Sequence, residues 1–257
     1  MFRRLASVAA LALVGGLALT GCQAASSSVA VQIGDFSITN ERVDQIVGQI
    51  DREVAAAHQS AQASATPAAA PTGEVEGLAK EQIGDVRADV VRFSAFNELS
   101  RRLVADKGLS LPAQDYKAAA AQIGLSEDNP YIKLAVDANA YRTLLLSKAQ
   151  VATPTEADLR SAYDRAVASG AQVPSFEETK PQLQQLPELG QGLGLRKEML
   201  DAAARLDVRV NPRYQPLNIP LSLVSNGQTQ FVLVSLPLGS PASPAVRDLP
   251  SAVPSAG

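Results

Sequence analysis

The segment Val29–Thr39 has the sequence VAVQIGDFSIT, and it decides how the N-terminal end of the chain folds. Apolar side chains alternate with smaller or polar ones from Val29 to Ile33, which is the two-residue period of a strand. Gly34-Asp35 is suited to a two-residue turn, and Phe36-Ser37-Ile38 then runs back along the first strand. The segment therefore predicts a β-hairpin.

A helical body is expected to follow this hairpin. Thr39 or Asn40 can cap a helix whose apolar residues recur every three or four positions. Those residues are Val43, Ile46, Val47, Ile50 and Val54. Residues 58–73 are rich in Ala, Ser, Gln and Pro and have no such stripe, so a flexible loop or a frayed helix end is expected there.

Start and stop signals divide residues 76–206 into five further helices. Capping boxes at Thr153–Glu156 and Ser175–Glu178 begin two of them, and glycines end others. The last helix is expected to be interrupted at Pro181 and Pro187 and weakened by the glycines that follow. The expected segments are 76–107, 110–123, 130–151, 153–170 and 175–206.

Strand patterns return after these helices. Asp207–Val210 predicts a short strand. Leu221–Val224 and Phe231–Val234 flank Asn226-Gly227 and predict a second hairpin, which is assigned to residues 215–236.

The expected fold class is mostly α. A two-stranded hairpin alone is only marginally stable in water, so the strands from the two ends of the chain are expected to pair in one small sheet. This β-sheet from N- and C-terminal strands would close a helical domain over residues 29–214, with the second hairpin after it. Residues 237–257 are rich in Pro, Ala and Ser, and a disordered tail is expected there.

The N-terminus carries the pattern of an export signal. Two arginines precede the uncharged apolar run Leu5–Leu19, which is shorter than a membrane-spanning helix requires. Leu19-Thr20-Gly21-Cys22 then resembles the lipobox of bacterial lipoproteins. The resemblance implies a signal peptide over residues 1–21, cleavage between Gly21 and Cys22, and a diacylglycerol on the Cys22 sulfur. Residues 22–28 would then be a lipid-anchored linker that holds the protein at the extracytoplasmic face of the cell membrane.

Composition restricts the remaining chemistry. Cys22 is the only cysteine, so its acylation leaves no thiol for a disulfide, a metal site or a nucleophile. Loss of the two signal-peptide arginines lowers the formal charge from −3 to about −5. An acidic chain gives no electrostatic basis for binding nucleic acid.

No group of residues forms a recognisable catalytic pattern. His58 is the only histidine and cannot build a metal site without partners. The adjacent acids Glu177-Glu178 and Glu127-Asp128 are explained by helix capping and turns. Gly190–Gly194 lacks the preceding strand that a phosphate-binding loop requires. The sequence therefore predicts no enzyme, no metal or cofactor site and no small-molecule substrate.

Several segments together resemble the SurA-type exported chaperones. Val31–Thr39 is similar to the opening turn of that family, Ser175–Leu183 to its last long helix, and Asp207–Val210 to its closing strand. Asn211–Tyr214 is similar to the sequence after that strand in actinobacterial lipoproteins of the group. The resemblance covers about residues 29–214 and implies a helical chaperone domain.

Many members of that family also carry a parvulin prolyl-isomerase domain before the last helix. Here only Ala171–Pro174 separate the stop at Gly170 from the cap at Ser175, and a single histidine cannot supply the histidine pair of a parvulin site. The resemblance therefore implies a chaperone or holdase that binds unfolded or newly exported polypeptides without isomerase activity. The alternative is a structural or accessory lipoprotein with one dedicated protein or cell-wall partner.

Overall fold

The computed structural model describes residues 28–64, 86–225 and 230–239. The expected signal peptide, Cys22, residues 65–73, the Asn226-Gly227 turn and residues 240–257 of the expected tail lie outside these ranges. The elements run in the order β1 (Val29–Ile33), β2 (Phe36–Thr39), α1 (Asn40–Ser64), α2 (Val86–Asp106), α3 (Tyr116–Ile123), α4 (Pro130–Lys148), α5 (Glu156–Ala168), α6 (Phe176–Gln185), α7 (Pro187–Arg205), β3 (Arg209–Val210), the 3₁₀ helix η1 (Pro212–Tyr214), β4 (Leu217–Ser225) and β5 (Gln230–Leu238). The start of the expected tail is wrong, because Pro237 and Leu238 belong to β5 and pair with β4.

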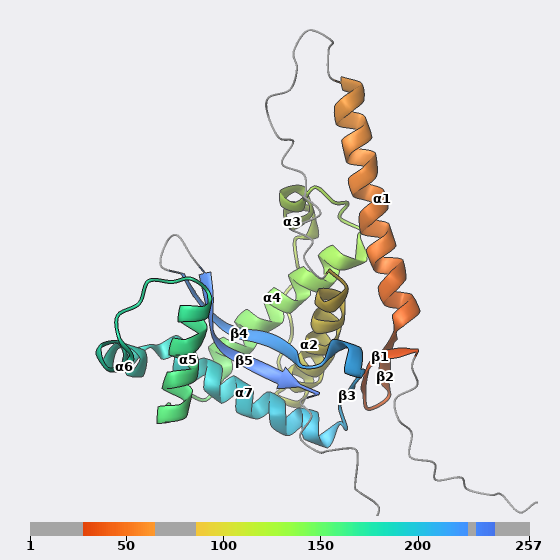
Figure 1. The fold of residues 1–257 in the computed structure, drawn as a ribbon. Coiled ribbons are helices and arrows are strands. Elements are labelled where there is room, and N and C mark those ends of the chain that lie inside the picture. Colours follow the sequence, from red (N-terminus) through yellow and green to blue (C-terminus); the bar gives the residue numbers. More distant parts are fainter. Residues whose placement is uncertain (1–27, 65–85, 226–229, 240–257) are drawn as a thin grey trace, which may run out of the picture.

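The described chain is mostly helical and has small antiparallel sheets, as expected (Figure 1). Strands from the two ends of the chain do pair, because Val31 of β1 lies opposite Val210 of β3 in a sheet of order β2-β1-β3. The expectation of a single sheet is wrong, since β4 and β5 form a separate two-stranded sheet.

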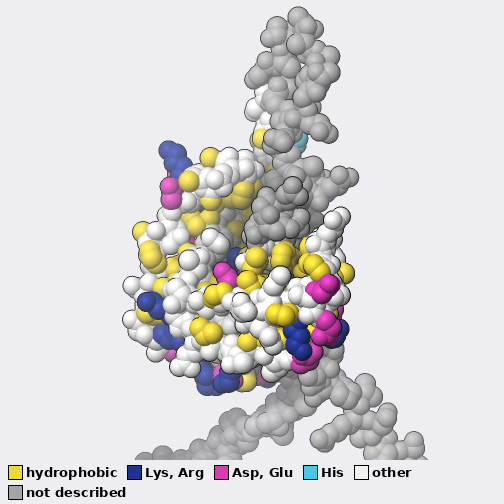
Figure 2. Space-filling view, turned by 90° about the vertical axis from the view of Figure 1, so that its left-hand side faces the viewer, with side chains coloured by type: hydrophobic (Ala, Val, Ile, Leu, Met, Phe, Trp, Pro, Cys, Tyr) yellow, Lys and Arg dark blue, Asp and Glu magenta, His cyan; other side chains and the backbone are white. Residues whose placement is uncertain are grey.

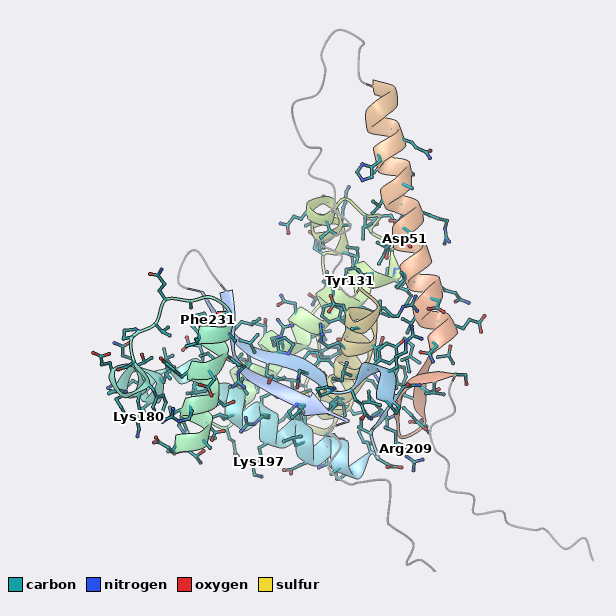
Figure 3. All side chains as sticks on the ribbon, in the orientation of Figure 1. Asp51, Tyr131, Lys180, Lys197, Arg209 and Phe231 are labelled. Atoms are coloured by element: carbon teal, nitrogen blue, oxygen red, sulfur yellow. The ribbon has the colours of Figure 1, made fainter. Side chains whose placement is uncertain are left out.

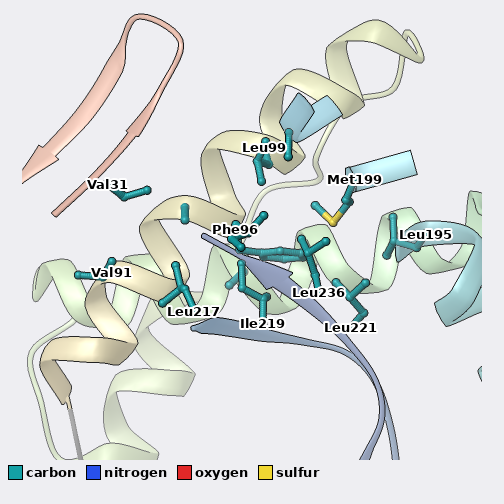
Figure 4. Packing of buried hydrophobic residues seen from close by; sticks show 14 of the residues in the cluster. Val31, Val91, Phe96, Leu99, Leu195, Met199, Leu217, Ile219, Leu221 and Leu236 are labelled. Atoms are coloured by element: carbon teal, nitrogen blue, oxygen red, sulfur yellow. The ribbon is translucent and has the colours of Figure 1, made fainter. Parts of the chain in front are cut away.

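The second hairpin belongs to the core of the helical domain and does not follow it as a separate unit. Its apolar side chains face α2, α5 and α7, and Phe96 of α2 lies among them (Figure 4). The fully buried strand residues include Leu217, Leu221 and Leu236. A two-stranded sheet needs such support to be stable in water, and the helices supply it.

The N-terminal hairpin packs on α2 through the buried Val31 and Ile33, and an arginine of α2 also binds its turn. Gly34 has a φ of 57°, which suits the first position of a two-residue hairpin turn. The Arg102 guanidinium donates to the Asp35 carboxylate in that turn and to Glu98 Oε1 at 2.6 Å. This arginine therefore fixes the position of β2 relative to α2.

Helix α1 is longer than the sequence pattern indicated. It continues through Ser64, so the first part of residues 58–73, for which a flexible loop or a frayed helix end was expected, is helical. Its alanine-rich composition explains this, because alanine favours helix without needing an apolar partner. Beyond Val54 the described side chains are exposed, and α1 stands away from the body (Figure 1).

Both capping boxes are present, one of them in a different register. Ser175 and Glu178 bond reciprocally at the start of α6, as expected. At α5 the cap is Thr155, with Asp158 as its partner, and not the Thr153–Glu156 pairing that the sequence suggested.

Several helix ends also differ from the sequence expectation. Helix α3 begins at Tyr116, because Asp115 accepts from the N–H of Ala118. Helix α4 ends at Lys148, three residues before the expected 151.

The break between α6 and α7 falls at Leu186, and Pro181 lies inside α6. The glycines of α7 were expected to weaken it, and the structure gives them a packing role instead. A Cβ at Gly192 would lie 2.7 Å from Ser222 Cβ, and one at Gly194 would overlap the carbonyl oxygen of Gln150. The helix therefore approaches β4 and the segment before α5 more closely than side chains would allow.

Candidate functional site

An open groove lies between the N-terminal hairpin, the first turns of α1, and the facing surfaces of α2 and α4. Its main hollow has a volume of ≈ 500 Å³, and a second hollow of ≈ 230 Å³ continues it. The two hollows share Phe36, Ser94, Leu134 and Asp137, so they form one feature, here called the hairpin groove. A third hollow of ≈ 370 Å³ beside α3 shares only Asp128 and Lys133 with it.

The floor of the hairpin groove is set by how α2 packs on α4. Phe93 contacts Tyr131 with ring centroids 6.0 Å apart, and the Asn97 side-chain amide donates to the Leu134 carbonyl at 3.0 Å. The Tyr131 ring lies between α4 and α2 (Figure 3). Because these contacts advance together along both helices, α2 and α4 run side by side in the same direction and leave a shallow channel.

The apolar part of the hairpin groove comes from three different elements. Phe36 and Ile38 come from β2, Ile46 from α1, and Pro130 with Leu134 from α4. Ile38 and Ile46 are buried, whereas Phe36 and Leu134 are partly exposed. The exposed portions of Phe36 and Leu134 therefore give the groove an apolar surface that a ligand could cover.

Charges of both signs surround this surface in equal number. The lining of the main hollow contains two basic residues, Arg42 and Lys133, and two acidic residues, Asp128 and Asp137. Lys133 is paired with Asp128 at 3.0 Å. Within the described residues, Arg42 and Asp137 form no ion pair. Arg42 donates to Gln45 at 3.3 Å, and Asp137 accepts from the Tyr116 hydroxyl at 2.9 Å.

A buried carboxylate closes one end of the groove. Glu98 has a 7% exposed side chain and accepts hydrogen bonds from Arg101 at 2.8 Å and Arg102 at 2.6 Å. Burial by itself raises the pKa of Glu98, but the two arginines outweigh it and hold the pKa below its usual value. Arg102 also donates to Asp35 and so links this end of the groove to the hairpin turn.

A second carboxylate fixes the opposite wall. Glu53 of α1 accepts from the Ser126 N–H at 2.8 Å and from Gln49 at 2.9 Å. Burial by itself raises the pKa of Glu53, but the hydrogen bonds from Ser126 and Gln49 outweigh it and hold the pKa below its usual value. Glu53 thus ties α1, which supplies Arg42 and Ile46 to the groove, to the loop before α4.

The residues that the sequence singled out do not meet in one site. His58 is exposed on α1, and Glu177 with Glu178 lies at the start of α6, far along the chain from the groove. Asp128 lines the groove, and Asn129 beside it caps α4 by accepting from the Tyr131 N–H at 2.9 Å. Gly190–Gly194 is part of a regular helix.

Sequence reasoning did not identify the groove residues. Phe36 was identified only as part of the N-terminal hairpin, Asn97 and Asp137 carry no motif, and Leu134 belongs to an apolar stripe that looks like ordinary core. Partial exposure is a property of the assembled fold, so the only signal in the sequence was the aromatic residue just after the hairpin turn.

The other described surfaces show weaker signs of a binding site than the hairpin groove. Figure 2 shows hydrophobic and charged side chains intermixed on the side that carries α5 and α6. Among the residues that the structure describes, the large exposed hydrophobic ones are Val151, Val167 and Leu200. In the described ranges no three His, Cys, Asp or Glu side chains gather as a metal site would need, and no helix there is long and apolar enough to cross a membrane.

Comparison of the chain with family models, with curated proteins and with solved structures found no match.

Proposed function

We propose that the protein is a membrane-tethered extracytoplasmic polypeptide-binding lipoprotein of the holdase kind, and that the hairpin groove is its client site. The observation that supports this most is the combination of partly exposed Phe36 and Leu134 with a rim whose formal charges cancel. Unfolded polypeptides share exposed apolar side chains and have no common charge, so such a surface suits them as a class.

The form of the groove also favours an extended chain over a compact ligand. Its two hollows follow α2 and α4 side by side, and both are open to solvent. Small-molecule sites are usually concave enough to bury most of their ligand. An open channel buries one side of an extended segment and leaves its other side free.

The tether is part of the proposal and rests on the lipobox resemblance at Leu19–Cys22. Seven linker residues, 22–28, span at most about 24 Å when fully extended. The groove would therefore work close to the membrane from which exported chains emerge. Metabolic labelling of cells with a radioactive fatty acid is expected to label the wild-type protein and not the Cys22→Ser variant.

The test of the proposed function is suppression of aggregation of reduced, unfolding α-lactalbumin by the chain from residue 22 onward, with Cys22→Ser to prevent acylation. Near-stoichiometric suppression is expected, with no acceleration of proline isomerisation by the same preparation. The variant Leu134→Gln should lose most of the effect, whereas Leu200→Gln, a matched change of a 39% exposed residue on α7, should keep it.

Failure of the unaltered protein to suppress aggregation would overturn the holdase function. Recovery of one stable partner at a fixed stoichiometry would then favour the dedicated-partner alternative. Equal activity of the two variants would leave a holdase whose client site is not the hairpin groove.

A further inference from the structure

The edge of the N-terminal sheet borders the hairpin groove. The sheet has the order β2-β1-β3, so β2 is an edge strand. Three residues of β2, Phe36, Ser37 and Ile38, line the main hollow. An edge strand presents backbone N–H and C=O groups without partners, and these can pair with another strand.

The register of the hairpin shows which backbone groups are free. Ile33 pairs with Phe36 and Val31 with Ile38, which leaves Ser37 opposite Gln32. The Ala30 carbonyl accepts from the Asn211 N–H on the β3 side at 2.9 Å. Alternate residues of β1 therefore face β3, and Val31 and Ile33 face β2.

It follows that Phe36 and Ile38 use their backbone groups in the β1 ladder, while the N–H and C=O of Ser37 point away from it. Ser37 is exposed, and it has no hydrogen-bond partner among the described residues. The free donor and acceptor of Ser37 thus lie at the wall of the groove, beside the partly exposed ring of Phe36.

We propose that a client polypeptide binds as an added strand, pairing with Ser37 at the free edge of β2 while one of its apolar side chains enters the hairpin groove. This inference rests on the proposed function and specifies the conformation in which the client is bound. Successive side chains of a strand point to opposite faces, so a segment that pairs with Ser37 can place every second side chain toward Leu134 and Ile46.

The charges of the groove support a polypeptide as the occupant. Arg42 and Asp137 are both without an ion pair within the described chain and lie in the same hollow. A polypeptide segment that carries both positive and negative side chains, or only uncharged ones, meets no net electrostatic repulsion in this hollow. A polyanion such as a nucleic acid or an anionic lipid surface would meet Asp128 and Asp137 without a compensating excess of basic residues.

Removal of one backbone donor tests the added strand. Ser37→Pro removes the outward N–H of Ser37 and leaves the β1 ladder intact, because proline is tolerated on an edge strand whose N–H faces away. Ser37→Ala removes only the hydroxyl and serves as the matched variant. The probe is a short fluorescent peptide with one central leucine among threonines and serines, and fluorescence anisotropy gives its dissociation constant for the chain from residue 22 onward with Cys22→Ser.

The proline variant is expected to bind the probe roughly three- to ten-fold more weakly than the alanine variant, as the loss of one hydrogen bond predicts. N-methylation of the probe backbone should weaken binding to the Cys22→Ser protein at one position and much less at the two neighbouring positions, whose N–H groups point away from β2. This second series decides the question if the proline variant does not fold.

Equal binding by the two variants, together with no alternation along the N-methylated probes, would overturn the added strand. The proposed function would survive that result if Leu134→Gln still weakened binding. If the Cys22→Ser protein bound neither the probe nor unfolded α-lactalbumin, both the added strand and the proposed function would be overturned.

Discussion

A methyl group at position 194 has no room in the structure, although replacing a helix-interior glycine by alanine normally stabilises a helix. A Cβ there would overlap the carbonyl oxygen of Gln150, which is backbone and cannot rotate away. We therefore expect Gly194→Ala to destabilise the protein by a few kcal/mol, of the order seen for overpacked cores. Urea unfolding followed by circular dichroism gives the free energy of unfolding.

The control for this substitution is Gly48→Ala in α1. Its Cβ would come no closer than 3.5 Å to the Arg52 guanidinium, which is flexible. Alanine should therefore stabilise the helix there by about 0.5–1 kcal/mol. A stabilising effect at Gly194 as well would show that α7 does not pack as closely as described.

The buried carboxylate of Glu98 predicts a dependence of stability on pH. Its folded pKa lies below the usual 4.5, so its contribution is present above that value and is lost as the pH falls through the lowered pKa. Glu98→Gln should cost about 1–3 kcal/mol near pH 7, the scale of a lost hydrogen bond to a charged group.

The difference in unfolding free energy between the wild-type protein and Glu98→Gln should shrink as the medium is acidified. Urea titrations of both proteins at several pH values measure it. The exposed Glu177 offers a control at neutral pH, where Glu177→Gln should change the free energy of unfolding by no more than about 0.5 kcal/mol. A difference for Glu98→Gln that stayed constant down to strongly acidic pH would contradict a lowered pKa.

At the scale of single residues, contacts within one helical turn could be predicted from the sequence, whereas contacts between residues far apart in the chain could not. Ser175 and Glu178 were identified as a capping box because both partners lie within one helical turn. The pairing of Arg102 with Asp35 and Glu98 joins residues far apart in the sequence, and no local pattern indicates it. The same holds for the partial exposure of Phe36 and Leu134.

Among the elements, β4 and β5 carry more of the fold than their position near the end of the chain suggests. Each buried aliphatic side chain contributes about 1.5–3 kcal/mol, and a domain is stable by only about 5–15 kcal/mol in total. Loss of several such side chains should therefore abolish folding. The two strands bury the side chains of Leu217, Ile219, Leu221, Leu233 and Leu236.

A chain that ends at Gln215 is expected to show no cooperative unfolding in urea and to aggregate. A chain that ends at Gly239, which keeps both strands, should unfold as the full chain does. Cooperative unfolding of the shorter chain would mean that the hairpin is a separate unit, as the sequence suggested.

The sequence predicted the existence of the helices better than it predicted where each helix ends or how the strands divide between sheets. Apolar residues that recur every three or four positions identify α2 and α4 from the sequence, and many of these residues are buried in α2. The continuation of α1 to Ser64 and the regular course of α7 through three glycines depend on propensity and on close packing, which periodicity does not report. The division of strands between two sheets is a long-range choice that hairpin signals leave open.

For the whole molecule, the structure and the N-terminal sequence lead to a single proposal. The hairpin at the start of the domain would follow the lipid anchor after a few residues, and β2 of that hairpin forms one wall of the groove. Client binding would therefore take place at the tethered end of the protein, while the exposed far end of α1 extends from the body (Figure 1).

The most direct test of this account is photo-crosslinking from inside the hairpin groove. p-Benzoylphenylalanine would replace Phe36 in one protein and Leu200 of α7 in another, and each would be irradiated with reduced, carboxymethylated α-lactalbumin. The account predicts a crosslinked adduct from position 36 and little or none from position 200, with the yield at position 36 lowered by Leu134→Gln. Adducts of equal yield from both positions, or an adduct from position 200 alone, would contradict it.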